Sequence, residues 1–304
     1  MTWAVGIDLG GTNVRAAQVD DTGSVGCVLT ERLDPDRSAI PFAQLIDMTG
    51  ALIDKADGDP PVGIGIGATG PVDPVTGVIS NPDTLPGAFQ GPVADALSAA
   101  TSLPAWLEND ADAAAVGEAW TGAGAGTQVL VCITIGTGIG VGVVRDGQIF
   151  RGASGSHPEP GHHVVDPSGP ACYCGASGCV ESLASSPAVL RAAALTGALP
   201  DGASPADVFA AASHNPACAL IVDRARSALC TAVLNLIAIH APDLVVVTGN
   251  GHGDLDGLLR RARQQVSGYQ FAPPGIEICG SSLGGLAGCV GAARLAFMSG
   301  SDDD

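Results

Sequence analysis

The sequence predicts a mixed α/β fold made of two related lobes. Strand-like and helix-like segments alternate along its 304 residues, and several of the strands run directly into glycine-rich turns. A strand–turn–strand pattern near the N-terminus returns near the middle of the chain, which indicates two lobes of related architecture. Alternating strands and helices form sheets covered by helices, and such sheets bind ligands at the loops that follow their strands.

The first strand–turn–strand pattern is "WAVGIDLGGTNVRAAQVDDTG", residues 3–23. It predicts a strand, a turn at Gly10-Gly11 and a returning strand that closes at a second turn. Periodicity and turn residues then predict a helix over 41–55, a buried strand within 61–71 that ends at Gly70-Pro71, a helix around 91–100, a short strand at 105–109 and a helix starting near Asp110.

The pattern returns at residues 127–149, "TQVLVCITIGTGIGVGVVRDGQI". A helix-rich part follows later, with a long apolar helix across Cys218–His240, a buried strand within 243–251 and a final helix of small residues within 284–297. We therefore expect an N-terminal lobe of residues 1–113, completed by a C-terminal helix at about 287–300, and a C-terminal lobe of residues 114–286.

The charge of the chain bears on its partners. The formal net charge is −18, with 13 Lys and Arg against 31 Asp and Glu, which argues against nucleic acid or an anionic membrane as a partner. No apolar run approaches the ~20 residues that span a bilayer, and no secretory signal is visible, so a cytoplasmic protein is expected. A nucleotide is compatible with this charge, because glycine turns present N–H groups and Mg²⁺ supplies positive charge.

Nine cysteines are present, an odd number in a long chain, which favours reduced thiols over disulfides. Six of them lie singly in apolar segments and are interpreted as packing residues: Cys27, Cys132, Cys218, Cys230, Cys279 and Cys289. The other three share one short stretch, "CYCGASGC", whose glycines permit the tight turns that such a stretch needs.

We call residues 159–181, "EPGHHVVDPSGPACYCGASGCVE", the cysteine loop. Three thiolates need a fourth ligand to complete a tetrahedral Zn²⁺ site. The candidate is His162, while His157 and His163 are alternatives that spacing leaves open. Four protein ligands leave no open coordination position, so the predicted zinc is structural and is not the catalyst.

Three glycine-rich loops follow predicted strands and are candidates for binding phosphate. They contain Asp8, Gly10, Gly11, Thr12 and Asn13 in "DLGGTNVR", Gly136, Thr137 and Gly138 in "TIGTGIG", and Gly249, Asn250 and Gly251 in "TGNG". Glycine lets backbone N–H groups approach phosphate oxygens. No G-x-x-x-x-G-K-[ST] motif occurs, so this is not a Walker-type site.

These hairpins resemble those of the sugar-kinase, Hsp70 and actin fold, a two-lobed actin-like ATPase fold (ribonuclease H-like) with the active site in the interlobe cleft. E-x-G-H followed by C-x-C-G-x-x-G-C-x-E, with "GIDLGGTNVR", "ND" and "IGTGIGVGVV" in the expected order, resembles the signature of the ROK family (repressors, open reading frames, sugar kinases) over nearly the whole chain. The resemblance implies an ATP- and Mg²⁺-dependent kinase of the primary hydroxyl of a hexose, assembled as a homodimer or homotetramer.

The resemblance also implies roles for individual residues. Asp110 would be the catalytic base that accepts the proton of the primary hydroxyl, and Asp8 would hold Mg²⁺ through water. The first two glycine loops would line the phosphates and the third would meet the nucleoside. The zinc ligands would be His162, Cys172, Cys174 and Cys179. The sugar would be bound by Asn109, Glu159, His162, Glu181, Gly70 and Asp83.

Outside that family context, Asp110 at a helix N-terminus would be interpreted as a cap. Its neighbours Glu108 and Asp112 are expected to face solvent, and Glu118 is expected to cap or pair within its helix.

The substrate prediction depends on departures from the family pattern. The segment "HPEPGH" is more similar to the fructokinase branch, whereas Cys172-x-Cys174 is more similar to the glucokinase and mannokinase branches. Asp83 and Phe89 stand roughly where the family has Asn and Trp. An added carboxylate would favour an amino group, so kanosamine (3-aminoglucose) or another aminohexose is an expected substrate alongside glucose.

Several alternatives remain open at the sequence level. They are a fructokinase or C7-cyclitol kinase of the same family, a non-catalytic ROK sugar sensor, an Hsp70- or actin-like ATPase, and a kinase that uses polyphosphate as donor. The sensor is less expected because the first hairpin begins at Trp3, which leaves no room for the N-terminal helix-turn-helix of ROK repressors.

Overall fold

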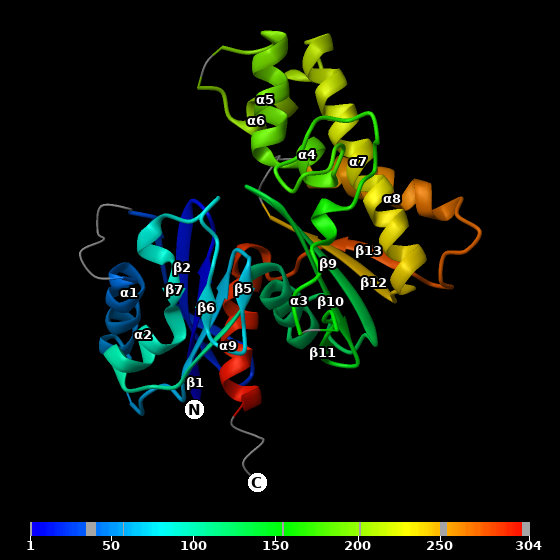
Figure 1. Cartoon of the computed structure of the whole chain (residues 1–304). Helices are drawn as coiled ribbons and strands as arrows, with labels where there is room; N and C mark the ends of the chain where they lie inside the picture. The colour runs from blue at the N-terminus through cyan, green and yellow to red at the C-terminus, as the bar shows by residue number, and fades with distance from the viewer. Residues whose placement is uncertain are drawn as a thin grey trace. The chain divides into compact units, whose positions relative to one another are not determined.

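The computed structural model describes residues 2–34, 41–56, 58–153, 155–200, 202–249 and 254–299 (Figure 1). The chain forms two compact units, of which the first comprises residues 1–126, 142–158 and 285–304 and the second comprises residues 127–141 and 159–284. The predicted lobes, residues 1–113 with 287–300 and residues 114–286, were defined by the repeated strand–turn–strand pattern, and this division stays a prediction.

The first unit is built on a five-stranded sheet of order β3-β2-β1-β4-β8. Its strands are β1 (Trp3–Leu9), β2 (Asn13–Asp20), β3 (Val25–Arg32), β4 (Ile64–Ala68) and β8 (Ala105–Asn109). Strand β4 is parallel to both β1 and β8, and Ala68 pairs with Leu9 on one side and with Asn109 on the other. The carboxyl ends of these three strands therefore meet at one edge of the sheet, where parallel sheets bind ligands.

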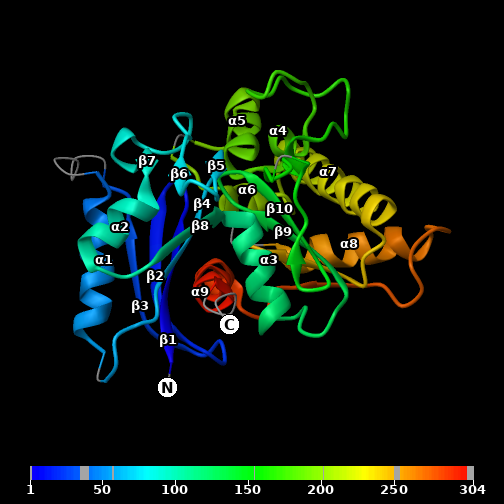
Figure 2. The same ribbon diagram turned by 60° about the horizontal axis from the view of Figure 1, so that its bottom comes forward.

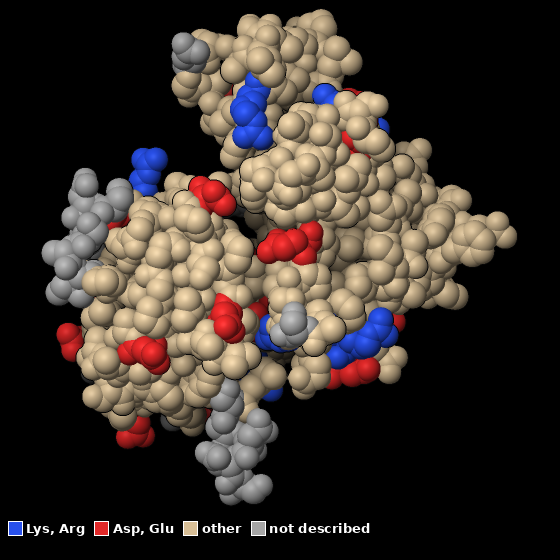
Figure 3. Space-filling model, in the orientation of Figure 1, with Lys and Arg blue, Asp and Glu red and all other residues tan. Residues whose placement is uncertain are grey.

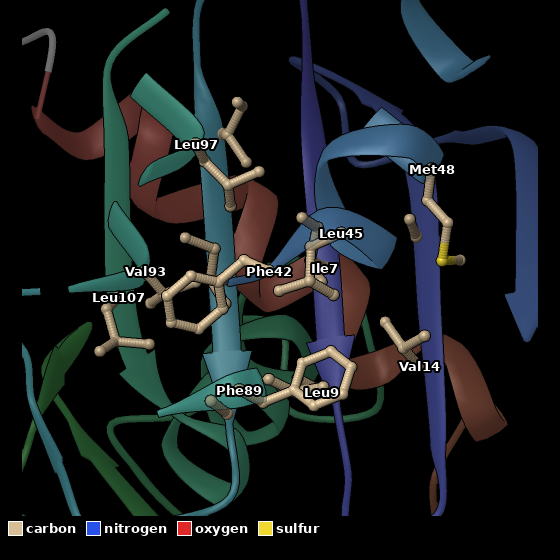
Figure 4. Packing of buried hydrophobic residues seen from close by; sticks show 14 of the residues in the cluster. Ile7, Leu9, Val14, Phe42, Leu45, Met48, Phe89, Val93, Leu97 and Leu107 are labelled. Atoms are coloured by element: carbon tan, nitrogen blue, oxygen red, sulfur yellow. The ribbon is translucent and has the colours of Figure 1, made fainter. Parts of the chain in front are cut away.

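Helices cover both faces of this sheet (Figures 1 and 2). Helices α1 (Ala43–Asp54) and α2 (Val93–Thr101) lie on one face, and α9 (Ala287–Ser299) contacts β1 and β4 on the other, next to α3 (Asp110–Trp120). Figure 4 shows the first face, where Phe42, Leu45 and Met48 pack against strand residues such as Ile7. Burial of these large apolar side chains holds the strands in place.

The face toward α9 is packed much more closely. A Cβ added at Gly6 or at Gly65 would collide with backbone oxygens of Cys289 and Ala292. Only glycine in the strands lets the helix backbone approach so closely. The small-residue composition of the last helix, noted in the sequence, thus serves helix–sheet contact.

A small three-stranded sheet follows β4. It consists of β5 (Val72–Asp73), β6 (Val78–Ile79) and β7 (Gly91–Pro92), with a 3₁₀ turn, η2 (Gly87–Phe89), before its last strand. The sequence did not predict these strands, which are only two residues long.

The second sheet has the order β11-β10-β9-β12-β13. Its strands are β9 (Val129–Ile135), β10 (Ile139–Arg145), β11 (Gln148–Ile149), β12 (Leu244–Thr248) and β13 (Glu277–Gly280). Strand β12 runs parallel to β9, with Thr248 paired to Thr134, so the second and third glycine loops start at the same edge. The division between the two units falls within β10.

The rest of the second unit is mostly helical. It contains η3 (Pro160–His162), α4 (Val180–Ala184), α5 (Ser186–Thr196), α6 (Pro205–Ala211), α7 (Pro216–His240) and α8 (Leu255–Ser267), and a 3₁₀ turn η4 (Gly284–Leu286) precedes α9. The predicted long helix is α7, which begins at Pro216 because Asn215 caps it with its side-chain oxygen. Among the described helices, none is both long and apolar enough to span a membrane.

The charged side chains that are visible in Figure 3 are mostly acidic, and the few Lys and Arg stand apart from one another on this face. This distribution agrees with the small number of basic residues in the chain.

Candidate active site

The first glycine loop connects β1 to β2 in the first unit. The N–H of Gly10 donates to the carbonyl oxygen of Asn13 at 3.1 Å, which closes the turn, and the side chains of Thr12 and Asn13 are exposed. Asp8 lies before this turn and forms an ion pair with Arg15 at 3.5 Å. Helix α9 begins beside Asp8, since a Cβ added at Gly288 would lie 2.8 Å from the Asp8 carboxyl carbon. Asp8 and the exposed turn between β1 and β2 thus lie at the edge of the first sheet where ligands are expected.

The strand–helix junction at the end of β8 shows which residue is the helix cap. The side-chain oxygen of Asn109 accepts hydrogen bonds from the N–H groups of Ala111 at 2.9 Å and Asp112 at 3.3 Å, which is the capping arrangement. Asp110 is the first helical residue, and its Oδ2 accepts a hydrogen bond from the Thr69 hydroxyl at 2.9 Å. The capping interpretation of Asp110 is therefore wrong, because Asn109 fills that role.

We call Asp8, Thr69, Asn109 and Asp110 the carboxylate site. The pKa of Asp8 is raised to about 6, mainly by burial and in smaller part by the charge of Asp110, while the charge of Arg15 opposes the shift. Burial also raises the pKa of Asp110, while the hydrogen bond from Thr69 opposes that shift. The two carboxylates repel each other, and a divalent cation bound near them would relieve this repulsion.

The prediction that Glu108 and Asp112 face solvent is wrong. Each residue is only 1% exposed. The carboxylate of Glu108 pairs with the guanidinium of Arg151, and Asp112 Oδ2 lies 2.7 Å from His157 Nδ1. Buried acids need such partners because desolvation penalises an isolated charge. Both partners come from the segment that follows β11, more than forty residues along the chain.

At the other end of α3, Glu118 is fully buried, and its Oε2 accepts a hydrogen bond from the N–H of Ala123 at 2.8 Å. This carboxylate therefore serves the turn that ends the helix, as the capping expectation proposed.

The loop after β4 contains Gly70, which precedes a cis peptide bond to Pro71. Buried Asn81 donates from Nδ2 to the carbonyl oxygens of Gly70 at 2.5 Å and Thr69 at 3.2 Å. It thereby holds the loop that carries the Thr69 hydroxyl, a role the sequence analysis did not assign. Asp83 is exposed, whereas Phe89 is 1% exposed and belongs to the hydrophobic core.

The second glycine loop connects β9 to β10 and is tied to Glu181. The N–H of Gly136 donates to the carbonyl oxygen of Gly138 at 2.9 Å, and the side chain of Thr137 is exposed. The Oε2 of Glu181 accepts a hydrogen bond from the N–H of Ile139 at 3.0 Å, and a Cβ at Gly138 would lie 2.8 Å from the same oxygen. Glu181 thus joins the predicted phosphate turn to the predicted sugar residues within one unit.

The third loop starts at Gly249, which has φ +102°. A Cβ there would collide with the carbonyl oxygen of Ile135, so this position requires glycine both for conformation and for space. The hydroxyl of Thr248 donates to the carbonyl oxygen of Gly284 at 3.2 Å. Asn250 and Gly251, predicted to meet the nucleoside, lie outside the described residues.

The cysteine loop brings together four potential metal ligands. One ligand atom from each of His162, Cys172, Cys174 and Cys179 lies within 4.8 Å of the other three. The Sγ of Cys172 is 3.4 Å from His162 Nδ1, and the Sγ atoms of Cys174 and Cys179 are 3.6 Å apart. Three sulfurs and one imidazole nitrogen at this spacing fit a structural zinc site.

The two alternative histidines have other partners. His157 pairs with Asp112, and the Nδ1 of His163 forms a hydrogen bond with the carbonyl oxygen of Pro160. These contacts favour His162 over His157 and His163 as the fourth potential ligand.

The backbone of the cysteine loop is irregular and turns sharply. It contains two isolated β-bridges, Val164 with Cys179 and Ala171 with Ser177, and Gly175 and Gly178 have positive φ. Burial raises the pKa of the Cys179 thiol to about 12. A cation among the sulfurs would stabilise the thiolate form and would close the loop.

The second nitrogen of His162 has a hydroxyl group as its neighbour. Its Nε2 lies 3.0 Å from the hydroxyl oxygen of Tyr173, and the two rings meet edge to face with centroids 5.0 Å apart. Burial raises the pKa of Tyr173, and the charges of Glu181 and Glu159 raise it further. The sequence analysis missed Tyr173, although its place between two metal ligands was a usable signal.

Comparison with known proteins identifies the class to which this fold and these residues belong. A glucokinase of Thermotoga maritima is 33% identical over 308 residues, which cover 96% of each chain. An N-acetylmannosamine kinase of Vibrio cholerae is 31% identical over 263 residues, 86% of this chain and 88% of that protein. The crystal structure of a ROK family glucokinase from Streptomyces griseus in complex with glucose and AMPPNP has a TM-score of 0.79 at 29% identity, covering 97% of this chain and 99% of that one.

These similarities place the chain among the ATP-dependent sugar kinases with the actin-like fold. The family model named "ROK family" matches residues 4–298, so the chain belongs to the ROK family. The family resemblance predicted from the sequence is confirmed, as is the fold class.

Proposed function

We propose that the protein transfers the γ-phosphoryl group of ATP to the primary hydroxyl of a hexose or aminohexose. The observation that carries this proposal is the position of Asp110 and the hydrogen bonds that its carboxylate makes. It follows a strand at the ligand-binding edge of its sheet, it is not the helix cap, and it accepts a hydrogen bond from Thr69. A carboxylate held in this way suits a base that removes a proton from a hydroxyl group.

In the proposed reaction, Asp110 accepts the proton of the primary hydroxyl as that oxygen attacks the γ-phosphorus. Two hydrogen bonds orient the carboxylate of Asp110. Its Oδ2 accepts from the Thr69 hydroxyl, and its Oδ1 accepts from the N–H of Ala111 at 2.8 Å. Phosphoryl transfer depends mostly on positioning and on neutralising the phosphate charge. The turns at Gly10-Gly11 and Gly136–Gly138 would supply backbone N–H groups to the phosphates. Asp8 would hold Mg²⁺ through water, and the ion would supply positive charge.

We propose that Glu159, His162, Glu181 and Asn109 bind the hydroxyl groups of the same sugar that Asp110 deprotonates. Ionised carboxylates are strong acceptors for sugar hydroxyls. Zinc held by the His162, Cys172, Cys174 and Cys179 side chains would supply structural support and no step of the reaction. It would fix the ring of His162, because one nitrogen faces the sulfurs.

The substrate proposal extends to aminohexoses because of Asp83. This acid is exposed and lies in the loop that buried Asn81 ties to Gly70. A carboxylate there would attract a protonated amino group. Kanosamine is therefore proposed as a substrate alongside glucose, and a fructokinase or cyclitol kinase of the same family is the alternative outcome of the test below.

The test is a coupled ADP-release assay with the zinc-loaded protein, ATP and Mg²⁺ over glucose, mannose, N-acetylmannosamine, glucosamine, kanosamine, fructose and cyclitols. We expect the highest kcat/KM for a glucose-configured sugar, and an Asp83→Asn variant should lose any preference for the amino sugar. Sugar binding without ADP release from any member of the panel would contradict the kinase proposal and would indicate a sensor.

A further inference from the structure

Tyr173 lies at the tip of the tight turn that carries two of the metal ligands. The N–H of Cys172 donates to the carbonyl oxygen of Ala176 at 2.8 Å, and the N–H of Gly175 donates to that of Cys172 at 3.1 Å. Tyr173 stands between Cys172 and Cys174, so any metal that fixes both sulfurs also fixes the backbone of Tyr173 from both sides.

The hydroxyl of Tyr173 is influenced by three of the side chains that the proposed function assigns to the sugar. It lies 3.0 Å from His162 Nε2, and the carboxylates of Glu181 and Glu159 both act on it electrostatically. A phenol hydroxyl can donate one hydrogen bond and accept another, which is also the capacity of a sugar hydroxyl. One imidazole nitrogen therefore already contacts a hydroxyl group of the protein itself, and two carboxylates act on that hydroxyl through their charge.

The surroundings of the tyrosine ring favour displacement of this hydroxyl. The residue is 67% exposed, and its ring makes an edge-to-face contact with His162. Rotation of an exposed side chain costs little packing energy, whereas a buried ring would be held by its neighbours.

From these observations we infer that Tyr173 is a substrate-mimicking residue of the sugar site, whose hydroxyl occupies the place of a sugar hydroxyl beside His162 and is displaced when sugar binds. This inference rests on the proposed function, because it takes Glu159, His162 and Glu181 as the sugar-binding groups. Tyr173 then sets sugar affinity by competition and does not take part in phosphoryl transfer.

The substitution Tyr173→Phe separates this role from direct sugar binding. It keeps the ring and removes the competing hydroxyl, so the KM for sugar and the Kd measured by calorimetry should both fall about fivefold, the equivalent of one ordinary hydrogen bond. The kcat and the KM for ATP should stay close to those of the parent. A rise in sugar Kd would show that the hydroxyl binds sugar, and an unchanged Kd would show that it does not compete; either result overturns the inference.

The chain offers a matched control, because it contains only two tyrosines. Tyr269, which packs edge to face with Phe271 in the segment after α8, is outside the cysteine loop. Tyr269→Phe makes the same chemical change and should leave the sugar Kd unaltered. Zinc content, measured on each variant, should equal that of the parent.

An NMR measurement on the sugar-free protein tests this inference independently of the proposed function. The ¹⁵N and ¹H signals of the His162 imidazole should shift in Tyr173→Phe and remain in place in Tyr269→Phe, since only the first substitution removes a hydrogen-bond partner. An unshifted Nε2 signal in Tyr173→Phe overturns the inference whether or not the protein phosphorylates sugar. A parent protein that neither binds nor phosphorylates any sugar contradicts the proposed function alone.

Discussion

The carboxylate site of the first unit and the cysteine loop of the second are held in place by different means. Asp8, Asn109 and Asp110 lie at the ends of paired strands, whose register fixes them relative to one another. Large apolar side chains bury the face of that sheet. The cysteine loop has two isolated bridges, and its four potential metal ligands converge where regular structure is scarce.

This difference indicates how each group of residues keeps its geometry. A site on strand ends is stabilised by the hydrophobic core and tolerates loss of a single contact. A site on an irregular loop depends on whatever closes the loop, which we propose to be a metal bound by the three thiolates and the imidazole. Substitutions in the two regions should therefore have different effects on chemistry, sugar binding and folding.

The largest effect is expected from Asp110→Asn. The amide cannot accept the hydroxyl proton, so kcat should fall about a thousandfold, within the range for loss of a general base. The sugar Kd should change little, because the cysteine loop is untouched. Steady-state kinetics with calorimetry on the same preparation would check both values, and a kcat near that of the parent would exclude Asp110 as the base.

Loss of the metal should affect the other region. Chelation of zinc, or the substitution Cys174→Ser, should lower kcat/KM for sugar about 10- to 100-fold and lower the melting temperature, since the loop that presents His162 and Glu181 loses its support. Nucleotide affinity should change much less. Cys27→Ser, in a half-buried cysteine of β3, is the control. Full activity of verified metal-free protein would refute a structural role for zinc.

Within the first unit, the buried pair of Asp112 and His157 should matter more for stability than a surface pair. His157→Gln leaves the Asp112 carboxylate buried without its partner and should lower the free energy of unfolding by about 3 kcal/mol. The double variant Asp112→Asn with His157→Gln should recover most of that loss. Arg224→Gln breaks an exposed pair with Asp166 and should cost less than about 1 kcal/mol. Urea denaturation of all three variants would reveal whether the buried pair differs from the exposed one.

The smallest effect concerns the pH dependence of stability. The pKa of Asp8 is raised to about 6, so the folded state binds a proton more readily than the unfolded chain. This contribution is greatest below the unfolded pKa near 4 and is lost as pH rises through 6. Without Mg²⁺, Asp8→Asn should reduce that decline in the pH dependence of the denaturation midpoint, and the raised pKa of Asp110 accounts for a remainder.

Asp20 offers a control of opposite sign for the Asp8 prediction. The Thr22 hydroxyl lowers the pKa of Asp20, so its contribution is lost as pH falls. Asp20→Asn should therefore leave the decline between pH 4 and 6 in place. A parent protein whose midpoint does not fall across this interval would contradict the shift assigned to Asp8.

The main elements of the fold could be predicted because their signals are local. Both glycine hairpins, the helix after Asn109 and the long helix before Pro242 follow from periodicity, turn residues and capping. The two-residue strands β5, β6 and β7 are too short to show any periodicity. Strand β3 was also missed, since its alternate residues are only partly buried and its pattern is weak.

The candidate site could be predicted most directly where its residues are close in sequence. The four potential metal ligands fall within eighteen residues of one another, and the family motif names all four in the sequence. Glu108 and Asp112 were assigned to solvent because an acid on a helix or short strand is usually exposed, and their partners Arg151 and His157 are distant in the chain. Tyr173 was missed because its hydroxyl contact depends on how the loop folds back.

Our main proposal is that Asp110 deprotonates the hydroxyl of a sugar that the cysteine loop binds. Its most direct test is a crystal structure of the zinc-loaded protein with sugar and a non-hydrolysable ATP analogue. We predict the primary hydroxyl within hydrogen-bonding distance of an Asp110 carboxylate oxygen, roughly 2.6–3.2 Å, with Glu159 and Glu181 on other hydroxyls of the same sugar. A sugar bound by Glu159 and Glu181 with its primary hydroxyl out of reach of Asp110 would contradict the account.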